Sequence, residues 1–223
     1  MAKKIYIDPG HSSKDPGAVG YAVERDLNEK VAKFMNEHLI ATYVCETKVD
    51  PVANNSLSAV VDAANAWKAD LFASIHFNAG GGDGYEALVY SSKNKALGQV
   101  FEKYIKAAGQ NSRGVKYRPD LAVLRLTNMP AVLNEGAFVD NKKDIQDWND
   151  DAELKVMGIA YANAAAEFLK LEKKETKQEQ PQTEKEYIYR VQVGAYSSKS
   201  SAEKRLAELK SVGFGGIIVK SEK

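Results

Sequence analysis

Segments with strand-like and helix-like hydrophobic patterns alternate along the first 171 residues of this chain of 223 residues. Short apolar or alternating runs are typical of strands, and apolar residues at three- and four-residue spacing are typical of amphipathic helices. Such an alternation favours an α/β sandwich, a mostly parallel sheet of about six strands covered by helices on both faces. Strands are predicted over residues 4–8, 42–46, 70–77, 85–90, 121–126 and 131–133, and helices over 24–40, 56–68, 95–109 and 152–171.

The composition changes abruptly after Leu171. Residues 172–186 contain Lys, Glu, Gln, Thr and one Pro but no large apolar side chain, which predicts a flexible charged linker. The last part regains a pattern, with strands predicted over 187–196 and 216–220 and a helix over 202–212. We therefore predict a first domain over residues 1–171, a linker over 172–186 and a small βαβ unit over 187–223. One βαβ unit is too small to bury a stable core alone, so we expect it to have a partner.

Charge and cysteine content exclude several classes of protein. The 31 basic and 30 acidic residues leave a formal charge of +1, which gives no general attraction to nucleic acid or to a membrane surface. Cys45 is the single cysteine, so no intramolecular disulfide is available. The sequence shows neither a secretory signal nor a long apolar span. We expect a chain made in the cytoplasm without a signal peptide, with no membrane or nucleic-acid partner.

Four residues with metal or acid–base chemistry lie where predicted strands end or the next helix begins: His11, Glu24, His76 and Glu135. Sites in parallel sheets collect at the carboxyl ends of strands, so we expect these side chains to converge. Two imidazoles and a carboxylate are the ligand set of a catalytic zinc that keeps a position open, and a second Glu can serve as general base. Glu24 has a competitor in Glu29, and as the first residue of a helix it could also only complement the helix dipole.

Three stretches of the first domain contain motifs that occur in a fixed order. They are Ile5-Tyr-Ile-Asp8-Pro-Gly10-His11 with Asp15-Pro-Gly17-Ala18 and Glu24-Arg-Asp-Leu-Asn28; Ala69-Asp70-Leu-Phe-Ala-Ser74-Ile-His76-Phe-Asn78-Ala79; and Pro130-Ala131-Val-Leu-Asn-Glu135 with Phe138 and Asn141. Together they resemble the N-acetylmuramoyl-L-alanine amidases of the amidase-3 type over about residues 3–171. The chain departs from the family pattern at Ser12-Ser13, where the family usually has glycines, and at Gly136, which comes one place early.

The resemblance implies a zinc-dependent peptidoglycan hydrolase that cleaves the amide between N-acetylmuramic acid and L-alanine of the peptide stem. By this resemblance His11, Glu24 and His76 bind Zn²⁺, and Glu135 is the general base that takes a proton from the attacking water and passes it to the leaving amine. The alternative is a zinc peptidase that cleaves another amide within the stem. The cell wall is the expected place of action, after release during phage lysis as an endolysin or during sporulation as an autolysin.

Three further residues have two interpretations each. Asp8 either orients a metal ligand or caps the turn at Pro9-Gly10. Asn78 either lines the substrate groove or holds the loop after His76. Arg125 either contacts a carboxylate of the peptide stem, which suits a guanidinium, or is a solvated strand residue. For His38, which lies on a helix face with no motif around it, we expect a structural role.

The C-terminal segment contains Tyr189-Arg-Val-Gln-Val-Gly194-Ala-Tyr196, followed by Ala202-Glu and Gly213-Phe214. It is similar to one repeat of a sporulation-related (SPOR) peptidoglycan-binding domain, of which the full module has two βαβ units. Tyr189, Gln192 and Tyr196 either contact sugar or only fill a half-buried strand. Because a half-length unit lacks a core, we expect two chains to form a homodimer through residues 187–223, with peptidoglycan as the other partner.

Overall fold

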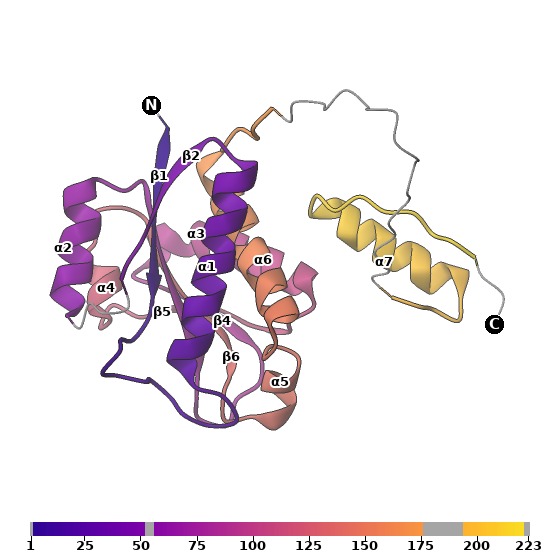
Figure 1. Cartoon of the computed structure of the whole chain (residues 1–223), viewed down its shortest axis with the longest axis horizontal. Helices are drawn as coiled ribbons and strands as arrows, with labels where there is room; N and C mark the ends of the chain where they lie inside the picture. The colour runs from indigo at the N-terminus through magenta and orange to yellow at the C-terminus, as the bar shows by residue number, and fades with distance from the viewer. Residues whose placement is uncertain (1, 52–55, 176–193, 221–223) are drawn as a thin grey trace, which may run out of the picture. The chain divides into compact units, whose positions relative to one another are not determined.

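The computed structural model of the chain describes residues 2–51, 56–175 and 194–220. The chain divides into two compact units, Met1–Lys174 and Glu175–Lys223. The first unit contains a six-stranded sheet in the order β2-β1-β3-β6-β4-β5 (Figure 1). Its strands are β1 (Lys3–Pro9), β2 (Cys45–Val49), β3 (Leu71–Asn78), β4 (Tyr85–Val89), β5 (Ser112–Tyr117) and β6 (Ala131–Phe138).

Every neighbouring pair of strands is parallel except β6 and β4, which are antiparallel. The reversal means that β4 and β5 begin at the edge of the sheet where β1, β3 and β6 end. The predicted α/β sandwich with a mostly parallel sheet is confirmed. Its helical elements are α1 (Glu24–Thr42), α2 (Leu57–Trp67), the 3₁₀ turn η1 (Ser92–Asn94), α3 (Lys95–Ala108), α4 (Ala122–Arg125), α5 (Lys142–Gln146) and α6 (Asp151–Leu169).

Local sequence signals explain where the longest helices begin and which side they bury. In α1 the residues Leu27, Val31, Met35 and Leu39 form one buried stripe. Ser56 caps α2 by accepting a hydrogen bond from the Ala59 N–H, and α6 begins with a full capping box at its N-cap. These signals fix the helix starts independently of the packing that follows.

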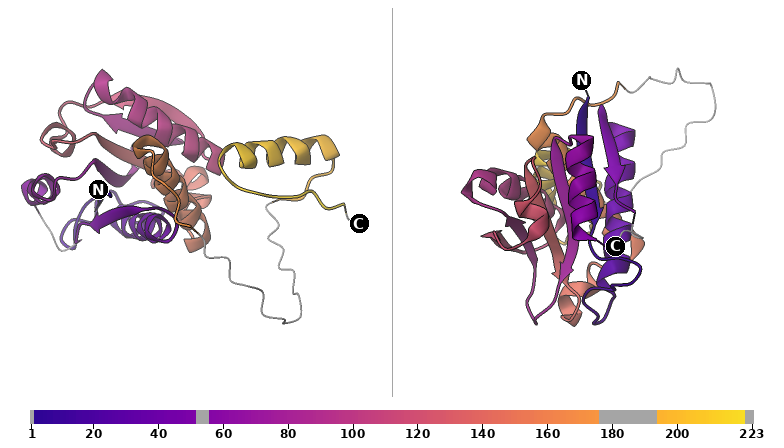
Figure 2. Two further views of the ribbon diagram at one scale, coloured as in Figure 1. Left: turned by 90° about the horizontal axis from the view of Figure 1, so that it is seen from above. Right: turned by 90° about the vertical axis from the view of Figure 1, so that its left-hand side faces the viewer.

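The helices cover the two faces of the sheet unequally (Figures 1 and 2). On one face α1, α3 and α6 pack on strand residues such as Ile5, Ile7 and Ile75 in the larger hydrophobic cluster. On the other face α2 and α4 pack on a smaller cluster that includes Tyr6 and Phe72. In the central strands β1, β3 and β6, successive apolar residues alternate between the two clusters, as a pleated strand requires.

The structure corrects four of the predicted elements. Residues 121–126, predicted as a strand, contain the short helix α4, because a short apolar run does not distinguish a strand from a buried helical turn. Residues 112–117, predicted as a loop, form β5, an edge strand of half-buried and exposed residues that includes Arg113 and Lys116. The second strand lies at Cys45–Val49 rather than 42–46, and β6 continues to Phe138 instead of ending at Leu133.

The described part of the second unit consists of α7 (Lys199–Ser211) and the extended residues that follow it. Ser198 caps α7 by accepting a hydrogen bond from the Ser201 N–H, which agrees with the predicted helix. The predicted strand 216–220 is not formed, since these residues have no strand partner in the described ranges. The predicted strand 187–196 lies mostly outside the described residues, and the dimer through 187–223 stays a prediction. Nowhere in the described ranges is there a helix with the length and apolar character needed to span a bilayer.

Candidate functional site

Three of the four predicted site residues meet at the end of the sheet where β1 and β3 finish. His11 follows β1, Glu24 is the first residue of α1, and His76 lies in β3. The Glu24 Oε1 atom lies 3.0 Å from His11 Nε2 and 2.9 Å from His76 Nδ1. Potential ligand atoms of the three residues all lie within 4.8 Å of one another, which makes them a possible metal site.

The backbone around this cluster is tightly packed: two positions have room only for glycine, and His11 has an unusual backbone conformation. A Cβ atom on Gly10 would lie 2.1 Å from His76 Nε2, and one on Gly17 would lie 2.6 Å from both Glu24 Oε2 and His11 Nε2. His11 itself has a φ of 71°, a left-handed conformation that is unusual for a non-glycine residue. The buried Asn28 amide donates to the Gly10 carbonyl oxygen at 3.0 Å and so holds the loop in place.

Hydrogen bonds position each side chain of the cluster from outside. The Asp15 carboxylate lies 2.9 Å from His11 Nδ1, so it orients the imidazole by the nitrogen that faces away from Glu24. Glu24 accepts from the Ala18 N–H at 2.8 Å and from the Phe77 N–H at 3.2 Å. Glu24 is thus tied both to the loop that follows His11 and to the strand that carries His76, whereas its competitor Glu29 pairs with Arg25 at 3.9 Å.

The charges of the cluster are strongly coupled. Burial alone would raise the pKa of Glu24, but hydrogen bonds with His11 and His76 outweigh it and hold that pKa well below its usual range. The hydrogen bond with Glu24, joined by one with Asp15, raises the pKa of His11 to about 9. Two nitrogen donors and one carboxylate, held this close by residues that leave no room for a Cβ, fit a Zn²⁺ ion.

Glu135 lies beside this cluster on the neighbouring strand. It is the register partner of His76 in the parallel pair β3–β6, and its Oε2 atom is buried without a hydrogen-bond partner among the described residues. Burial, together with the charges of Glu24 and Glu86, raises the pKa of Glu135 to about 7, against the opposing effect of His76. Glu135 therefore has a carboxylate that is next to the ligands and not bonded to them, as expected of a base.

The other predicted site residues lie elsewhere or have structural contacts. Asp8 is buried and accepts a hydrogen bond from the Ser74 hydroxyl at 2.6 Å, and among the described residues its side chain makes no hydrogen bond with His11, Glu24 or His76. Asn78 accepts from the Ala79 N–H at 2.8 Å and donates to Glu86 at 3.4 Å. Arg125 ends α4, where it donates to the Asp120 carbonyl oxygen, and His38 lies 3.1 Å from the Asn163 side-chain oxygen.

Sequence reasoning missed a group of charged residues next to Glu135. Glu86 lies directly opposite Glu135 in the antiparallel pair β4–β6, and it is buried. Its Oε1 atom accepts from Arg113 Nε and Lys116 Nζ, each at 2.5 Å. The available signal was Glu86 itself, an acidic residue inside the otherwise apolar strand Tyr85–Val89.

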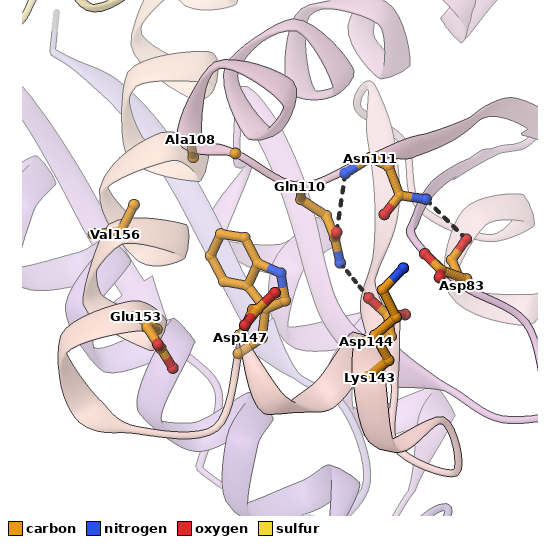
Figure 3. A pocket seen from close by; sticks show the side chains of 11 residues that line it. Asp83, Ala108, Gln110, Asn111, Lys143, Asp144, Asp147, Glu153 and Val156 are labelled. Carbon is orange, nitrogen blue, oxygen red and sulfur yellow. Dashed lines mark hydrogen bonds between the residues drawn. The ribbon is translucent and has the colours of Figure 1, made fainter. Parts of the chain in front are cut away.

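A separate pocket of about 370 Å³ lies between the start of β5, α5 and α6 (Figure 3). It is lined by Gln110, Asn111, Asp144 and neighbouring residues, and by no residue of the metal cluster. The buried Asp144 carboxylate accepts from the Gly84 and Phe138 backbone N–H groups, both at 2.8 Å, and from Gln110 at 2.8 Å (Figure 3 shows the last of these). Asp144 therefore ties together the backbone at Gly84 and Phe138 and the Gln110 side chain beside this pocket.

Comparison with known proteins agrees with the geometry. The family model described as N-acetylmuramoyl-L-alanine amidase (Amidase_3) matches residues 5–167. The chain belongs to this family. The amidase CwlM of Bacillus licheniformis is 31% identical over 97% of this chain and 84% of its own length, and a sporulation-specific N-acetylmuramoyl-L-alanine amidase of Bacillus subtilis is 30% identical over the same shares. An endolysin of Bacillus phage SPP1 is 36% identical over 78% of this chain and 69% of its own length.

Solved amidase structures show the same fold. The catalytic domain of the amidase CwlV from Bacillus (Paenibacillus) polymyxa covers 76% of this chain and 99% of its own, with 31% identity and a TM-score of 0.72. An amidase from Clostridium difficile 630 covers 76% and 97%, with 25% identity and a TM-score of 0.71. A SPOR domain model matches residues 158–220. The first part of this match overlaps helix α6, which belongs to the first unit. The rest of the match lies in the second unit.

Proposed function

We propose that this amidase cleaves the bond between N-acetylmuramic acid and L-alanine with a zinc ion held by His11, Glu24 and His76, and with Glu135 as the general base. One observation supports the proposal above the others. Three potential ligands from three different elements converge to within 4.8 Å of one another, and an unbonded carboxylate lies next to them in register. The family is zinc-dependent, and its substrate is peptidoglycan.

Each side chain has a role that follows from its position. Zinc, when bound, polarises the scissile carbonyl group and makes water a stronger nucleophile near neutral pH. His11, Glu24 and His76 hold the ion, and Asp15 and the Ala18 and Phe77 N–H groups keep two of these ligands in orientation. Glu135 accepts the proton of the attacking water and transfers it to the leaving amine of L-alanine.

The position of the site on the sheet allows a large polymer to reach it. The face covered by α2 and α4 is apolar under those helices, at Tyr6, Phe72 and Leu133. Further along the same strands and on the same face it becomes polar, at Asp8, His76 and Glu135. The imidazoles of His11 and His76 keep 22% and 18% of their side-chain surface exposed, so the ligands are reachable from solvent.

The SPOR domain gives this amidase a second contact with the cell wall. SPOR domains bind peptidoglycan, and the described part of the second unit contains the helix α7 of that domain. We propose that it keeps the catalytic unit on glycan between cleavage events, which raises the effective concentration of substrate. One similar protein is a sporulation-specific amidase and another is a phage endolysin, so the comparisons are compatible with release during sporulation and with release during phage lysis. In each setting the proposed place of action is the cell wall.

Mass spectrometry of digested peptidoglycan tests the function. The zinc-loaded protein is incubated with purified cell walls, and soluble products are analysed for their new ends. We expect stems that begin with a free L-alanine amino group, together with intact muramic acid. New ends inside the stem would instead identify a peptidase, and no products from any wall preparation would reject a hydrolase.

A further inference from the structure

A row of charged side chains crosses the sheet from the metal cluster to the edge strand β5. His76 pairs with Glu135, Glu135 pairs with Glu86, and Glu86 contacts Arg113 and Lys116 on β5. Glu86 and Leu88 alternate with Tyr85 and Ala87, which belong to the opposite cluster, so Glu86 lies on the same face as Glu135. The two cations are therefore on the face that carries the proposed reaction centre.

A β-bulge explains how two residues three places apart reach the same carboxylate. In a regular strand, residues i and i+3 point to opposite faces. Here Tyr85 pairs with Ser112 and Ala87 with Val115, so β5 has one more residue than β4 over this interval. Gly114 lies in that interval with a φ of 87°, the left-handed conformation typical of a bulge glycine. The inserted residue turns Arg113 and Lys116 toward the same side.

The two cations are held in place by Glu86, and both keep exposed surface that a ligand can contact. Glu86 is buried and accepts both hydrogen bonds, and the Arg113 guanidinium lies 5.3 Å from the centre of the Phe138 ring. The contact with Glu86 uses Nε of Arg113, and its two Nη groups make no hydrogen bond with any described residue. Arg113 and Lys116 keep 43% and 42% of their side-chain surface exposed. Two cations on one carboxylate give the group of Glu86, Arg113 and Lys116 a net positive charge, carried by its two partly exposed side chains.

Protection of the sheet edge is the simplest other role for these charges. Lysine and arginine on edge strands discourage pairing with other chains, and for this they need only point into solvent. Arg113 and Lys116 instead converge on a buried carboxylate beside the proposed base, and a bulge is needed to bring them there. A residue of the edge that only blocks pairing does not require this arrangement.

We propose that Arg113 and Lys116 bind a free carboxylate of the peptide stem, on the second residue beyond the scissile amide. The inference rests on the proposed function and adds a determinant of substrate specificity to it. Neighbouring strands are about 4.8 Å apart, so β5 lies roughly 10 Å from β6 and its long side chains reach back to Glu86 on the strand between. Two residues of an extended peptide span about 7 Å, which brings the second residue of the stem to these cations.

Two muropeptides that differ at one group test this inference. One has a free carboxylate on the second stem residue, and in the other that carboxylate is amidated. The zinc-loaded full chain should cleave the free form about tenfold more efficiently in kcat/KM, mainly through KM, as expected for one charge-assisted hydrogen bond. Arg113→Gln and Lys116→Gln should each reduce this preference, and the double variant should abolish it.

Two control variants separate charge from structure. Arg113→Lys keeps the charge and should retain most of the preference. Lys103→Gln removes a similarly exposed lysine that pairs with Glu167 on the other side of the first unit, and it should leave the preference unchanged. Thermal melting of each variant identifies any loss of folding, and the single variants remain informative if the double variant does not fold.

The outcomes distinguish the inference from the function on which it rests. Equal cleavage of both muropeptides by the unmodified chain, or an undiminished preference in the folded Arg113→Gln and Lys116→Gln variants, would overturn the inference and leave the amidase function intact. An absence of cleavage of either muropeptide at the muramic acid amide would reject the proposed function itself.

Discussion

The two faces of the sheet differ in the polarity of their side chains and in the role that this polarity supports. The face under α1, α3 and α6 is mostly apolar, as at Ile5, Ile7 and Ile75, and its buried Asn134 accepts a hydrogen bond from the Tyr85 hydroxyl. The other face is apolar only where α2 and α4 cover it, and its remaining part carries Asp8, His76, Glu135 and Glu86. The same strands supply both faces, so neighbouring residues such as Ile75 and His76 have opposite surroundings.

The difference separates stability from chemistry within single strands. Burial of apolar surface on the covered face drives folding, at roughly 25 cal/mol for each Å² removed from water. The polar part of the other face costs stability, since the Oε2 atom of Glu135 is buried without a partner in the described ranges. Such a cost persists where function requires it. Substitutions on the two faces should therefore affect different measurements.

The largest effect is expected from Glu135→Gln. Without the general base, kcat should fall about a thousandfold, while bound zinc stays at one ion per chain because Glu135 is not a ligand in the proposed site. Turnover of purified peptidoglycan and metal analysis of the dialysed variant measure these two quantities. Glu37→Gln, an exposed glutamate paired with Lys33, is the matched control. Loss of zinc together with activity would mean that Glu135 is a ligand and that its assigned role is wrong.

Substitutions of two neighbouring residues on β3 should affect different quantities: the stability of the metal-free protein and the additional stability that zinc provides. Ile75→Ala leaves a cavity in the larger cluster and should lower the free energy of unfolding by about 2–5 kcal/mol, with or without zinc. His76→Gln should cost about 1 kcal/mol in the metal-free protein but remove the stabilisation that zinc gives by binding the folded state. Urea unfolding with zinc and with a chelator measures both. Equal losses in both variants under both conditions would contradict the division between the faces.

A smaller effect concerns the pH dependence of stability through Glu86. Burial alone would raise the pKa of Glu86, but hydrogen bonds from Lys116 and Arg113 outweigh it and lower the pKa below its ordinary value of 4.5. Between the two values the unfolded chain binds more protons than the folded one, so this contribution is present above about pH 4.5 and is lost as the pH falls through the folded value. Glu86→Gln should show a smaller acid-induced loss of unfolding free energy than the unmodified chain. A pH profile parallel to that of Glu37→Gln would contradict this.

Much of the fold could be predicted from the sequence because its central strands and long helices have strong patterns. The central strand β3 is almost wholly buried, and α1 has a clear apolar stripe. The errors fall where pattern and environment separate. The Ser-Arg-Gly-Val-Lys-Tyr sequence of β5 does not alternate regularly between apolar and polar residues, and α4 is a segment of only four residues. In β6 the polar Asn134 and Glu135 resemble a strand end, although the strand continues to Phe138.

The site was predictable where motifs identify it and not where only tertiary contacts do. His11, Glu24 and His76 were recognised from their local sequence, and the structure brings them together. Arg113 and Lys116 could not be assigned, because their common direction depends on the bulge at Gly114 and on the antiparallel pairing of β4. Arg125 is predicted as part of a strand and as a possible contact of a stem carboxylate, but it is the last residue of the helix α4.

The reversal of β4 and β5 divides the working surface into two parts that vary independently. The proposed metal ligands lie at or near the ends of β1 and β3, whereas Glu86 and Arg113 lie near the beginnings of strands that run the opposite way, and Lys116 reaches Glu86 from further along β5. The loops that enter those strands, residues 79–84 and 109–111, contain none of the proposed metal ligands. Insertions or exchanges in these loops can thus change the surface that would contact the peptide stem while the proposed metal site stays unchanged. Related amidases can therefore acquire a preference for cell walls of a different composition through these loops alone.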